Sequence, residues 1–238
     1  MGLSDDAVER IKQMLIDGEL QPGQRLPVEK DLASRLGVSR NSLREAVRAL
    51  TTIRVLQTRQ GDGTYVTSLS PELLLDTMSF VVDLHQDATV LQFLEVRRLL
   101  EPEAAAMAAG SIEDTGLTEL DRLLADAEEI AGGELVDHEK LVDNDQAFHG
   151  LINRSCRNPV LATVIEGMSG ATIRARVWRG ITEEYAARRT VAEHRAIYRA
   201  LRNRDANRAR LYAAVHIAGV EDWLRGVLST GIREEVWT

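Results

Sequence analysis

Residues 26–50 read LPVEKDLASRLGVSRNSLREAVRAL, and residues 53–66 read IRVLQTRQGDGTYV. In the first stretch, apolar residues recur at helical spacing on both sides of Gly37: Leu32, Ala33, Leu36, Val38, Leu43, Val47 and Leu50. Two short helices joined by a tight turn explain this pattern, because glycine adopts positive φ at little cost. In the second stretch, Val55–Thr58 and Thr64–Val66 flank Gln60-Gly61-Asp62-Gly63, which has the composition of a hairpin turn. Together the two stretches predict a winged helix-turn-helix.

The second helix of this unit has the chemistry of a DNA reader. Ser39 stands where the helix needs an N-cap. The first turns after it carry arginines and small hydrogen-bonding residues: Arg40, Asn41, Ser42, Arg44 and Arg48. Such side chains bind phosphates and the edges of bases in the major groove. We therefore expect operator DNA to be a partner of this chain.

The net charge of −8 fits this expectation once it is divided along the chain. Between Gln24 and Gly61, eight basic residues oppose three acidic ones, a net charge of +5. From Leu69 onward, 19 basic residues oppose 28 acidic ones, a net charge of −9. A basic patch beside an acidic remainder confines phosphate attraction to one unit.

Length and composition indicate a mainly α protein of two domains. The 238 residues can bury two cores, and aromatic residues make up only 4%. Cys156 is the single cysteine, which excludes an intramolecular disulfide framework and favours a reducing compartment. No apolar run approaches a membrane span and no signal peptide is evident, so we expect a cytoplasmic protein.

The remainder of the chain predicts an antiparallel α-helical bundle. Ser4–Gly18 is one helix, Thr67–Pro71 reads as a linker, and no strand is evident after Pro71. Helical periods cover residues 72–85, 89–109, 114–131, 135–155, 158–180, 182–203 and 205–229. We therefore expect a DNA-binding domain over residues 1–68 and an effector-binding and dimerisation domain over residues 69–238.

Three of these helices carry ionisable side chains on their apolar stripes: Asp145 and His149, His194, and His216. A buried imidazole or carboxylate is costly unless it is paired, so these groups are expected to meet. One carboxylate and three imidazoles suit a divalent cation such as zinc, with positions left for water or ligand. Each histidine alone fits an ordinary hydrogen-bonded core position, and Asp145 with His149 fits a simple i,i+4 pair. His85 and His138 lie near helix ends, where we expect solvent.

A further helix directs Arg97 inward, on a face shared with Phe93, Val96, Leu100, Ala104 and Met107. A buried guanidinium binds a carboxylate or phosphate, so Arg97 is a candidate for holding an anionic effector. An internal pair with Asp145 or Glu101 is the alternative. Asn153, one turn beyond His149, is a second candidate for lining the same cavity. Arg174 and Arg176 are weaker ones, because a solvated face fits at least one of them.

With these features the chain resembles the GntR-type transcription regulators, in particular the FadR-like branch, which has an all-helical (FCD-type) effector domain. The matching stretches are PGQRLPVEKDLASRLGVSRNSLREAVRAL, GDGTYV, EVRRLLEPEAAAMAA, DNDQAFHGLINRSCRNPVL, EHRAIYRAL, RDANRAR and the helix bearing His216. The resemblance implies a dimeric regulator whose helical domain binds a small ligand, commonly an organic acid such as a carboxylate. It also implies a divalent metal, zinc or alternatively nickel or another transition ion, held by Asp145, His149, His194 and His216.

The resemblance also implies which residues of this chain contact DNA. Positions that touch phosphates or bases in such proteins match Arg25, Lys30, Ser39, Arg40, Asn41, Ser42 and Arg44, and the wing tip matches Gln60 and Gly61. Three positions depart from the family pattern. Val28 replaces a small capping residue, Arg54 replaces a glycine that turns the chain into the wing, and Asn41 replaces a Thr or Pro.

These observations predict a homodimeric, effector-controlled transcription regulator, a repressor and not an enzyme. The first alternative is a metal-dependent hydrolase, which needs a positioned general base. No inward glutamate near the candidate ligands is evident from the sequence. The second alternative is a constitutive DNA-binding protein whose metal serves only folding.

Overall fold

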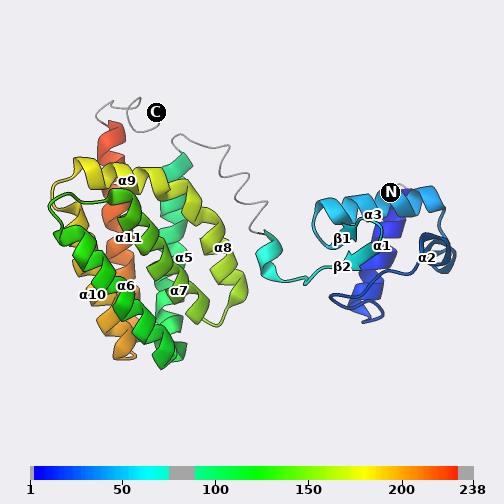
Figure 1. The fold of residues 1–238 in the computed structure, drawn as a ribbon, viewed down its shortest axis with the longest axis horizontal. Coiled ribbons are helices and arrows are strands. Elements are labelled where there is room, and N and C mark those ends of the chain that lie inside the picture. Colours follow the sequence, from blue (N-terminus) through cyan, green and yellow to red (C-terminus); the bar gives the residue numbers. More distant parts are fainter. Residues whose placement is uncertain (1–2, 75–88, 230–238) are drawn as a thin grey trace. The chain divides into compact units, whose positions relative to one another are not determined.

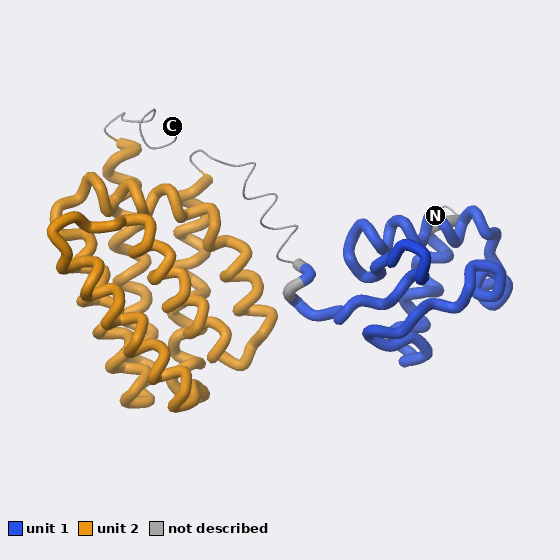
Figure 2. The backbone as a smooth tube through the Cα atoms, in the orientation of Figure 1, with its two compact units in different colours: residues 1–73 blue, residues 74–238 orange. Residues whose placement is uncertain are grey.

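The computed structural model describes residues 3–74 and 89–229 and divides into two compact units, residues 1–73 and 74–238 (Figure 2). The first unit contains three helices, α1 (Leu3–Ile16), α2 (Glu29–Leu36) and α3 (Arg40–Thr52), and a hairpin of β1 (Leu56–Arg59) and β2 (Gly63–Val66). Its core is formed by apolar residues of all three helices and the hairpin, among them Ile11, Leu32, Leu43 and Leu56. This arrangement confirms the winged helix-turn-helix.

Local chemistry explains how α2 and α3 are separated. Gly37 ends α2 in the left-handed conformation, at φ +63°. Ser39 then caps α3, and its hydroxyl accepts a hydrogen bond from the backbone N–H of Ser42. Val28 precedes α2 without a side-chain cap, as its apolar side chain requires. The turn therefore fixes where α3 begins.

The wing is a short antiparallel hairpin with register Leu56↔Val66 to Arg59↔Gly63. Gly61 supplies the positive φ that its three-residue loop needs. The segment before α2 adds a further edge to β2, because the Leu26 N–H donates to Thr64 and the Val66 N–H donates to Gln24. This third edge was not predicted. Arg54 leads into the wing at φ +60°, the conformation for which glycine is the usual residue.

The second unit is a helical bundle, confirming the predicted architecture (Figure 1). Its helices are α5 (Thr89–Ser111), α6 (Asp114–Gly132), α7 (His138–Ser155), α8 (Pro159–Ser169), α9 (Ile173–Thr182), α10 (Ala186–Arg202) and α11 (Ala206–Ser229). Helix α5 packs mainly against α11 and also contacts α7, α8 and α10. The largest core cluster lies among α5, α6, α7, α10 and α11 and includes Phe148, Ile197 and Leu201.

Two predicted helices differ in the structure. The helix expected over residues 158–180 is interrupted by the 3-10 turn η2 (Gly170–Thr172), which separates α8 from α9. The interruption follows the Ser169-Gly170 pair, a common cause of helix kinks. Of the helix expected over 72–85, the structure shows the 3-10 turn η1 (Pro71–Leu74), and the rest lies outside the described residues.

The inward face of α5 is also different from the prediction. Arg97 is buried as expected, but Val96 and Met107 are exposed, and Val90, Leu94 and Glu101 are buried instead. Because α5 contacts four other helices, its own apolar residues are distributed around the helix axis. Their spacing therefore does not identify a single buried face. Within residues 3–74 and 89–229, no helix is long and apolar enough to cross a membrane.

Candidate functional site

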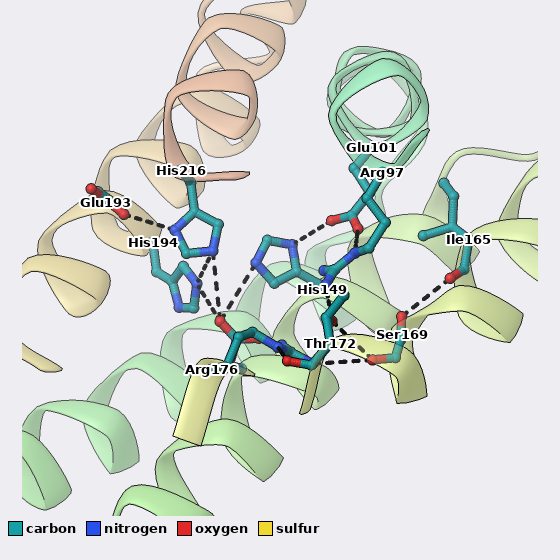
Figure 3. Close-up of polar contacts among 11 residues, drawn as sticks. Arg97, Glu101, His149, Ile165, Ser169, Thr172, Arg176, Glu193, His194 and His216 are labelled. Atoms are coloured by element: carbon teal, nitrogen blue, oxygen red, sulfur yellow. Dashed lines mark hydrogen bonds and ion pairs between the residues drawn. The ribbon is translucent and has the colours of Figure 1, made fainter. Parts of the chain in front are cut away.

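Four ionisable side chains from three helices converge inside the bundle (Figure 3). Asp145 and His149 come from α7, His194 from α10 and His216 from α11. The Asp145 Oδ1 atom lies 3.2 Å from Nε2 of His194, 3.6 Å from Nε2 of His216 and 3.8 Å from Nε2 of His149. One donor atom from each residue lies within 4.8 Å of all the others. The four residues that the sequence predicted to meet therefore lie together, and all four are buried.

Carboxylates outside the cluster orient two of the imidazoles. The Nδ1 atom of His216 lies 2.8 Å from Oε2 of Glu193, and Nδ1 of His149 lies 3.2 Å from Oε2 of Glu101. In the neutral ring, a carboxylate at Nδ1 favours the tautomer that carries its proton there, which leaves the lone pair of Nε2 for a cation at the centre of the cluster. Phe148 stacks on His194 at 4.4 Å between ring centroids and fixes the third ring.

The charges around Asp145 keep this carboxylate ionised. Burial alone raises its pKa, but the Arg176 guanidinium and hydrogen bonds from His194 and His216 outweigh burial and hold the pKa well below its usual range. Arg176 is itself buried and donates from Nη1 to the second oxygen, Oδ2. Oδ1 therefore remains free to face the three imidazoles.

The imidazoles respond differently to the same surroundings. Burial lowers the pKa of His194 to about 4, so this ring is neutral at pH 7. Burial also lowers the pKa of His216, but hydrogen bonding to Asp145 and Glu193 raises it more, and the net shift is upward. A position between two carboxylates that attracts a proton also attracts a metal cation.

The arrangement fits a divalent metal ion. The Nε2 atom of His149 is buried and has no hydrogen-bond partner, which is costly unless another group binds it. Three imidazole nitrogens and one carboxylate oxygen are ligands that zinc, nickel and similar ions take. The outer carboxylates at Nδ1 are typical of metal-bound histidines.

A second buried ion pair lies beside this cluster, between Arg97 and Glu101 of α5. Arg97 is 2% exposed, and its Nε donates to Glu101. Its Nη1 donates to the Thr172 hydroxyl at 2.5 Å. The kink at η2 places Thr172 there, and the Ser169 carbonyl accepts from the same hydroxyl (Figure 3). Of the two roles considered for Arg97, the structure contains the internal pair, and an effector contact stays a prediction.

The Arg97–Glu101 pair predicts a pH-dependent stability. Burial raises the pKa of Glu101, but the charge of Arg97 and the contact with His149 lower it more, so the folded value lies well below 4.5. The contribution of the ionised Glu101 carboxylate to the free energy of unfolding is then complete above pH 4.5, and it declines as the pH falls below that value. On metal-free protein, Glu101→Gln is expected to lower the free energy of unfolding at pH 7 by about 1–3 kcal/mol. The difference between the thermal melts of the two proteins should shrink progressively as the pH falls below 4.5, whereas a constant difference would contradict this origin.

A small cavity of about 40 Å³ adjoins the cluster. Asp145 and His216 lie in its wall together with Arg176 and Arg179, and His138 and Gly180 also line it. Arg97 and Asn153 do not line it. Asn153 is buried one helical turn after His149, so its predicted ligand role stays a prediction. Arg174 is exposed, whereas Arg176 lines the cavity as one of the weaker candidates.

Two sequence-based expectations near the cluster are wrong. No glutamate was expected beside the candidate ligands, yet Glu101 is fully buried and Glu193 is half-buried, each against an imidazole. The burial of Glu101 could have been predicted from its i,i+4 spacing from Arg97, which was itself expected to point inward. His138 was expected in solvent, but it is half-buried and its Nδ1 is enclosed without a hydrogen-bond partner. Of the two histidines expected in solvent, His85 lies outside the described residues.

The residues expected to contact DNA lie on the surface of the first unit. Arg25, Lys30, Ser39, Arg40, Asn41, Arg44, Gln60 and Gly61 are exposed, and Ser42 is half-buried beneath the cap of α3. The Nε atom of Arg44 donates to both carboxylate oxygens of Glu29, at 3.0 and 3.2 Å. Glu29 thus orients the Arg44 side chain on α3, which crosses the surface beside the wing (Figure 1).

Comparison with known families matches both units. Residues 3–66 match the profile described as "Bacterial regulatory proteins, gntR family". Residues 92–219 match the profile described as "FCD domain". The second match contains all four residues of the cluster and both carboxylates that contact it.

Individual relatives match over nearly the whole chain. The HTH-type transcriptional regulator LutR of Bacillus subtilis is 29% identical over 92% of this chain and 100% of its own length. The galactonate operon transcriptional repressor of Escherichia coli is 29% identical over 90% of this chain and 93% of its own. Among solved structures, the Streptococcus agalactiae GntR protein is 26% identical, with a TM-score of 0.66 over 92% of this chain and 99% of that one.

Proposed function

The chain belongs to the gntR family of bacterial regulatory proteins and carries an FCD domain, and we propose that it is a homodimeric repressor controlled by a hydroxy acid bound beside a metal ion. Its relatives are transcription regulators, and a winged helix-turn-helix is the DNA-reading part of this chain. The observation that supports the sensing role is the convergence of four buried donors beside a cavity in the second unit.

In this proposal a divalent cation is held by Asp145 Oδ1 and by Nε2 of His149, His194 and His216. Zinc is the first candidate, and nickel or another transition ion is the alternative, because imidazole and carboxylate suit several of them. When bound, the ion supplies a Lewis-acidic centre to which oxygen atoms of a small molecule can coordinate. Glu101 and Glu193 keep the imidazoles oriented, and Arg176 neutralises the second oxygen of Asp145.

The charge balance of the cluster favours an anionic effector. The cluster and the groups that contact it contain three carboxylates, those of Asp145, Glu101 and Glu193, and two guanidinium groups, those of Arg97 and Arg176, which gives a net charge of −1 with neutral imidazoles. A divalent cation changes this to +1, and a monoanion then neutralises the buried site. A 2-hydroxy acid offers a carboxylate and a hydroxyl oxygen on neighbouring carbons. One relative is named for galactonate, an acid of this class.

Operator binding is assigned to Arg25, Lys30, Arg40, Arg44 and the wing tip at Gln60-Gly61, with Ser39, Asn41 and Ser42 beside them on α3. Two copies of α3 in a dimer read a pseudo-palindromic operator in successive major grooves. The acid changes operator affinity only if it binds one arrangement of the protein more tightly than another. Selection of binding sites from random duplexes tests this assignment, because it should enrich a pseudo-palindrome, and no enrichment would contradict it.

The hydrolase alternative receives little support from the glutamates found near the cluster. Glu101 and Glu193 contact the Nδ1 atoms, on the opposite side of each ring from Nε2. A general base must reach a water molecule at the metal-binding side of the rings. The two carboxylates instead act as orienting groups for the imidazoles.

Metal content tests the sensing half of the proposal. We expect native mass spectrometry and elemental analysis of purified protein to find one divalent ion per chain. His216→Ala should lose that ion, because it removes one of four ligands and the partner of Glu193. Thr118→Ala, a change on exposed helix surface, should retain it. Equal metal content in both variants would contradict the assignment of the ligands.

A further inference from the structure

The paired helices α5 and α11 expose apolar side chains at the surface of the bundle. The ion pairs Arg98–Glu221 and Arg210–Glu103 show that the two helices run antiparallel, and α10 contacts both of them and covers one side of the pair. Of the large apolar side chains exposed within residues 89–229, more than half lie on these two helices: Val96, Leu99, Met107, Leu211 and Val215. Single exposed apolar residues are normal, but a group of them on adjacent elements marks a binding surface.

Helix α11 carries two apolar stripes on opposite sides. The inward stripe includes Ala213, Ile217 and Val220, which are buried in the bundle. We call the other one the outward stripe, and it consists of Leu211, Ala214, Val215 and Ala218. Leu211 is 56% and Val215 is 53% exposed, and the two alanines are half-buried. Because the outward side of a surface helix is normally polar, an apolar stripe there indicates a partner.

The two ends of the outward stripe are flanked by opposite charges. Arg208 lies about one helical turn before the stripe and Asp222 about one turn after it, and their side chains are 67% and 75% exposed. Within the described residues, Arg208 pairs with Asp205 at 3.5 Å and Asp222 pairs with Arg225 at 3.2 Å. Both charged groups remain accessible to a further partner.

The outward stripe is complementary to a reversed copy of itself. A second α11 can lie antiparallel across a twofold axis that passes between Ala214 and Val215. In this register Leu211 faces Ala218 of the second copy, and Val215 faces its Ala214. Each larger side chain then meets a small one, which allows the two helix axes to approach to roughly 8–10 Å. A twofold interface requires this kind of self-complementary surface.

The same register also pairs the charges. Arg208 of each copy faces Asp222 of the other, so two opposite-charge contacts flank the apolar centre. A parallel arrangement would instead bring Arg208 against Arg208 and Asp222 against Asp222. The order of charges along α11 therefore favours a second, antiparallel copy of this chain as the occupant of the surface.

We propose that the outward stripes of two copies of α11, packed antiparallel, form the centre of the homodimer interface, and that Leu99 of α5 extends it. Leu99 belongs to the same surface because its position on α5 lies between the two ion pairs that bracket the stripe. This inference rests on the proposed function, which requires two copies of the chain but does not name the surface that joins them.

Charge reversal tests the register. Arg208→Glu or Asp222→Arg alone creates two like-charged contacts and should raise the dimer Kd of the full-length protein about tenfold, measured by fluorescence-detected sedimentation. The double variant Arg208→Glu/Asp222→Arg restores opposite charges and should return the Kd to within about threefold of the unaltered protein. Recovery requires contact between copies, because the two residues lie about 21 Å apart along one helix.

Leu211→Glu tests the apolar centre of the interface. It should raise the dimer Kd at least about a hundredfold, because a carboxylate from each copy would be buried without a partner. Leu135→Glu is the control, since Leu135 is 92% exposed in the loop between α6 and α7, and it should leave the Kd unchanged. Circular dichroism checks the fold of each variant, and the exposed charge reversals decide the question if Leu211→Glu does not fold.

The outcomes separate this inference from the proposed function. A dimer whose Kd is unchanged by Leu211→Glu, or that shows no loss and recovery in the charge reversals, overturns the inference and leaves the outward stripe to another occupant. The proposed homodimer would then stand on a different surface. If the unaltered protein sediments as a monomer at every concentration, the homodimer of the proposed function is contradicted as well.

Discussion

Arg44→Ala is expected to weaken binding to the operator duplex, as identified by selection from random sequences, by a factor of about 30 or more. We expect no other single substitution in the winged helix-turn-helix to have a larger effect. Arg44 lies exposed in the second turn of α3, and a good base contact from arginine contributes about 1–3 kcal/mol. A dimer places two copies on one operator, so the loss is about 2–6 kcal/mol. Fluorescence anisotropy with a labelled operator measures the change in Kd at fixed salt.

The control for this variant removes the same charge elsewhere in the unit. Arg35 lies on α2 and pairs with Glu19, away from the start of α3. Arg35→Ala should therefore change the operator Kd far less than Arg44→Ala. Metal content and dimer mass should be unaltered in both. Unchanged operator binding by the Arg44 variant, with the fold intact by circular dichroism, would remove α3 from the role of recognition helix.

Asp145→Ala is expected to abolish metal binding and to lower the free energy of unfolding of the metal-free protein by about 3–5 kcal/mol. The second effect follows because Arg176, buried against Asp145, loses its carboxylate, and a buried charge without its partner is costly. Urea unfolding of chelated protein measures the stability, and elemental analysis measures the metal. The two readouts separate the structural role of this carboxylate from its role as a ligand.

Asp143→Ala is the matched control, because Asp143 is exposed on the same helix, two residues earlier. It should retain the metal and change stability by less than about 0.5 kcal/mol. Retention of a full complement of metal by Asp145→Ala would show that the ion is bound elsewhere in the protein.

The parts of this protein that follow a regular period could be predicted from sequence. The stripes of α7, α10 and α11 placed Asp145, His149, His194 and His216 inward, and the need of buried ionisable groups for partners predicted that they meet. The turn at Gly37 and the cap at Ser39 were equally readable, because each depends on the local chemistry of one or two residues.

The parts set by tertiary contacts could not be predicted in the same way. The position of Thr172 against Arg97 depends on a kink at η2, and no periodic pattern in the sequence marks that kink. The enclosure of His138 depends on the approach of Gly180 from a different helix. Helix α5 is surrounded by others, so its apolar residues did not reveal which face holds Glu101.

The central claim is that an acid at the metal cluster controls DNA binding, and one measurement tests it most directly. The operator Kd is determined with and without gluconate for the metal-loaded protein, the chelated protein and His216→Ala. We predict that gluconate weakens operator binding several-fold for the metal-loaded protein alone. An equal response in all three proteins, or no response in any of them, would contradict the claim.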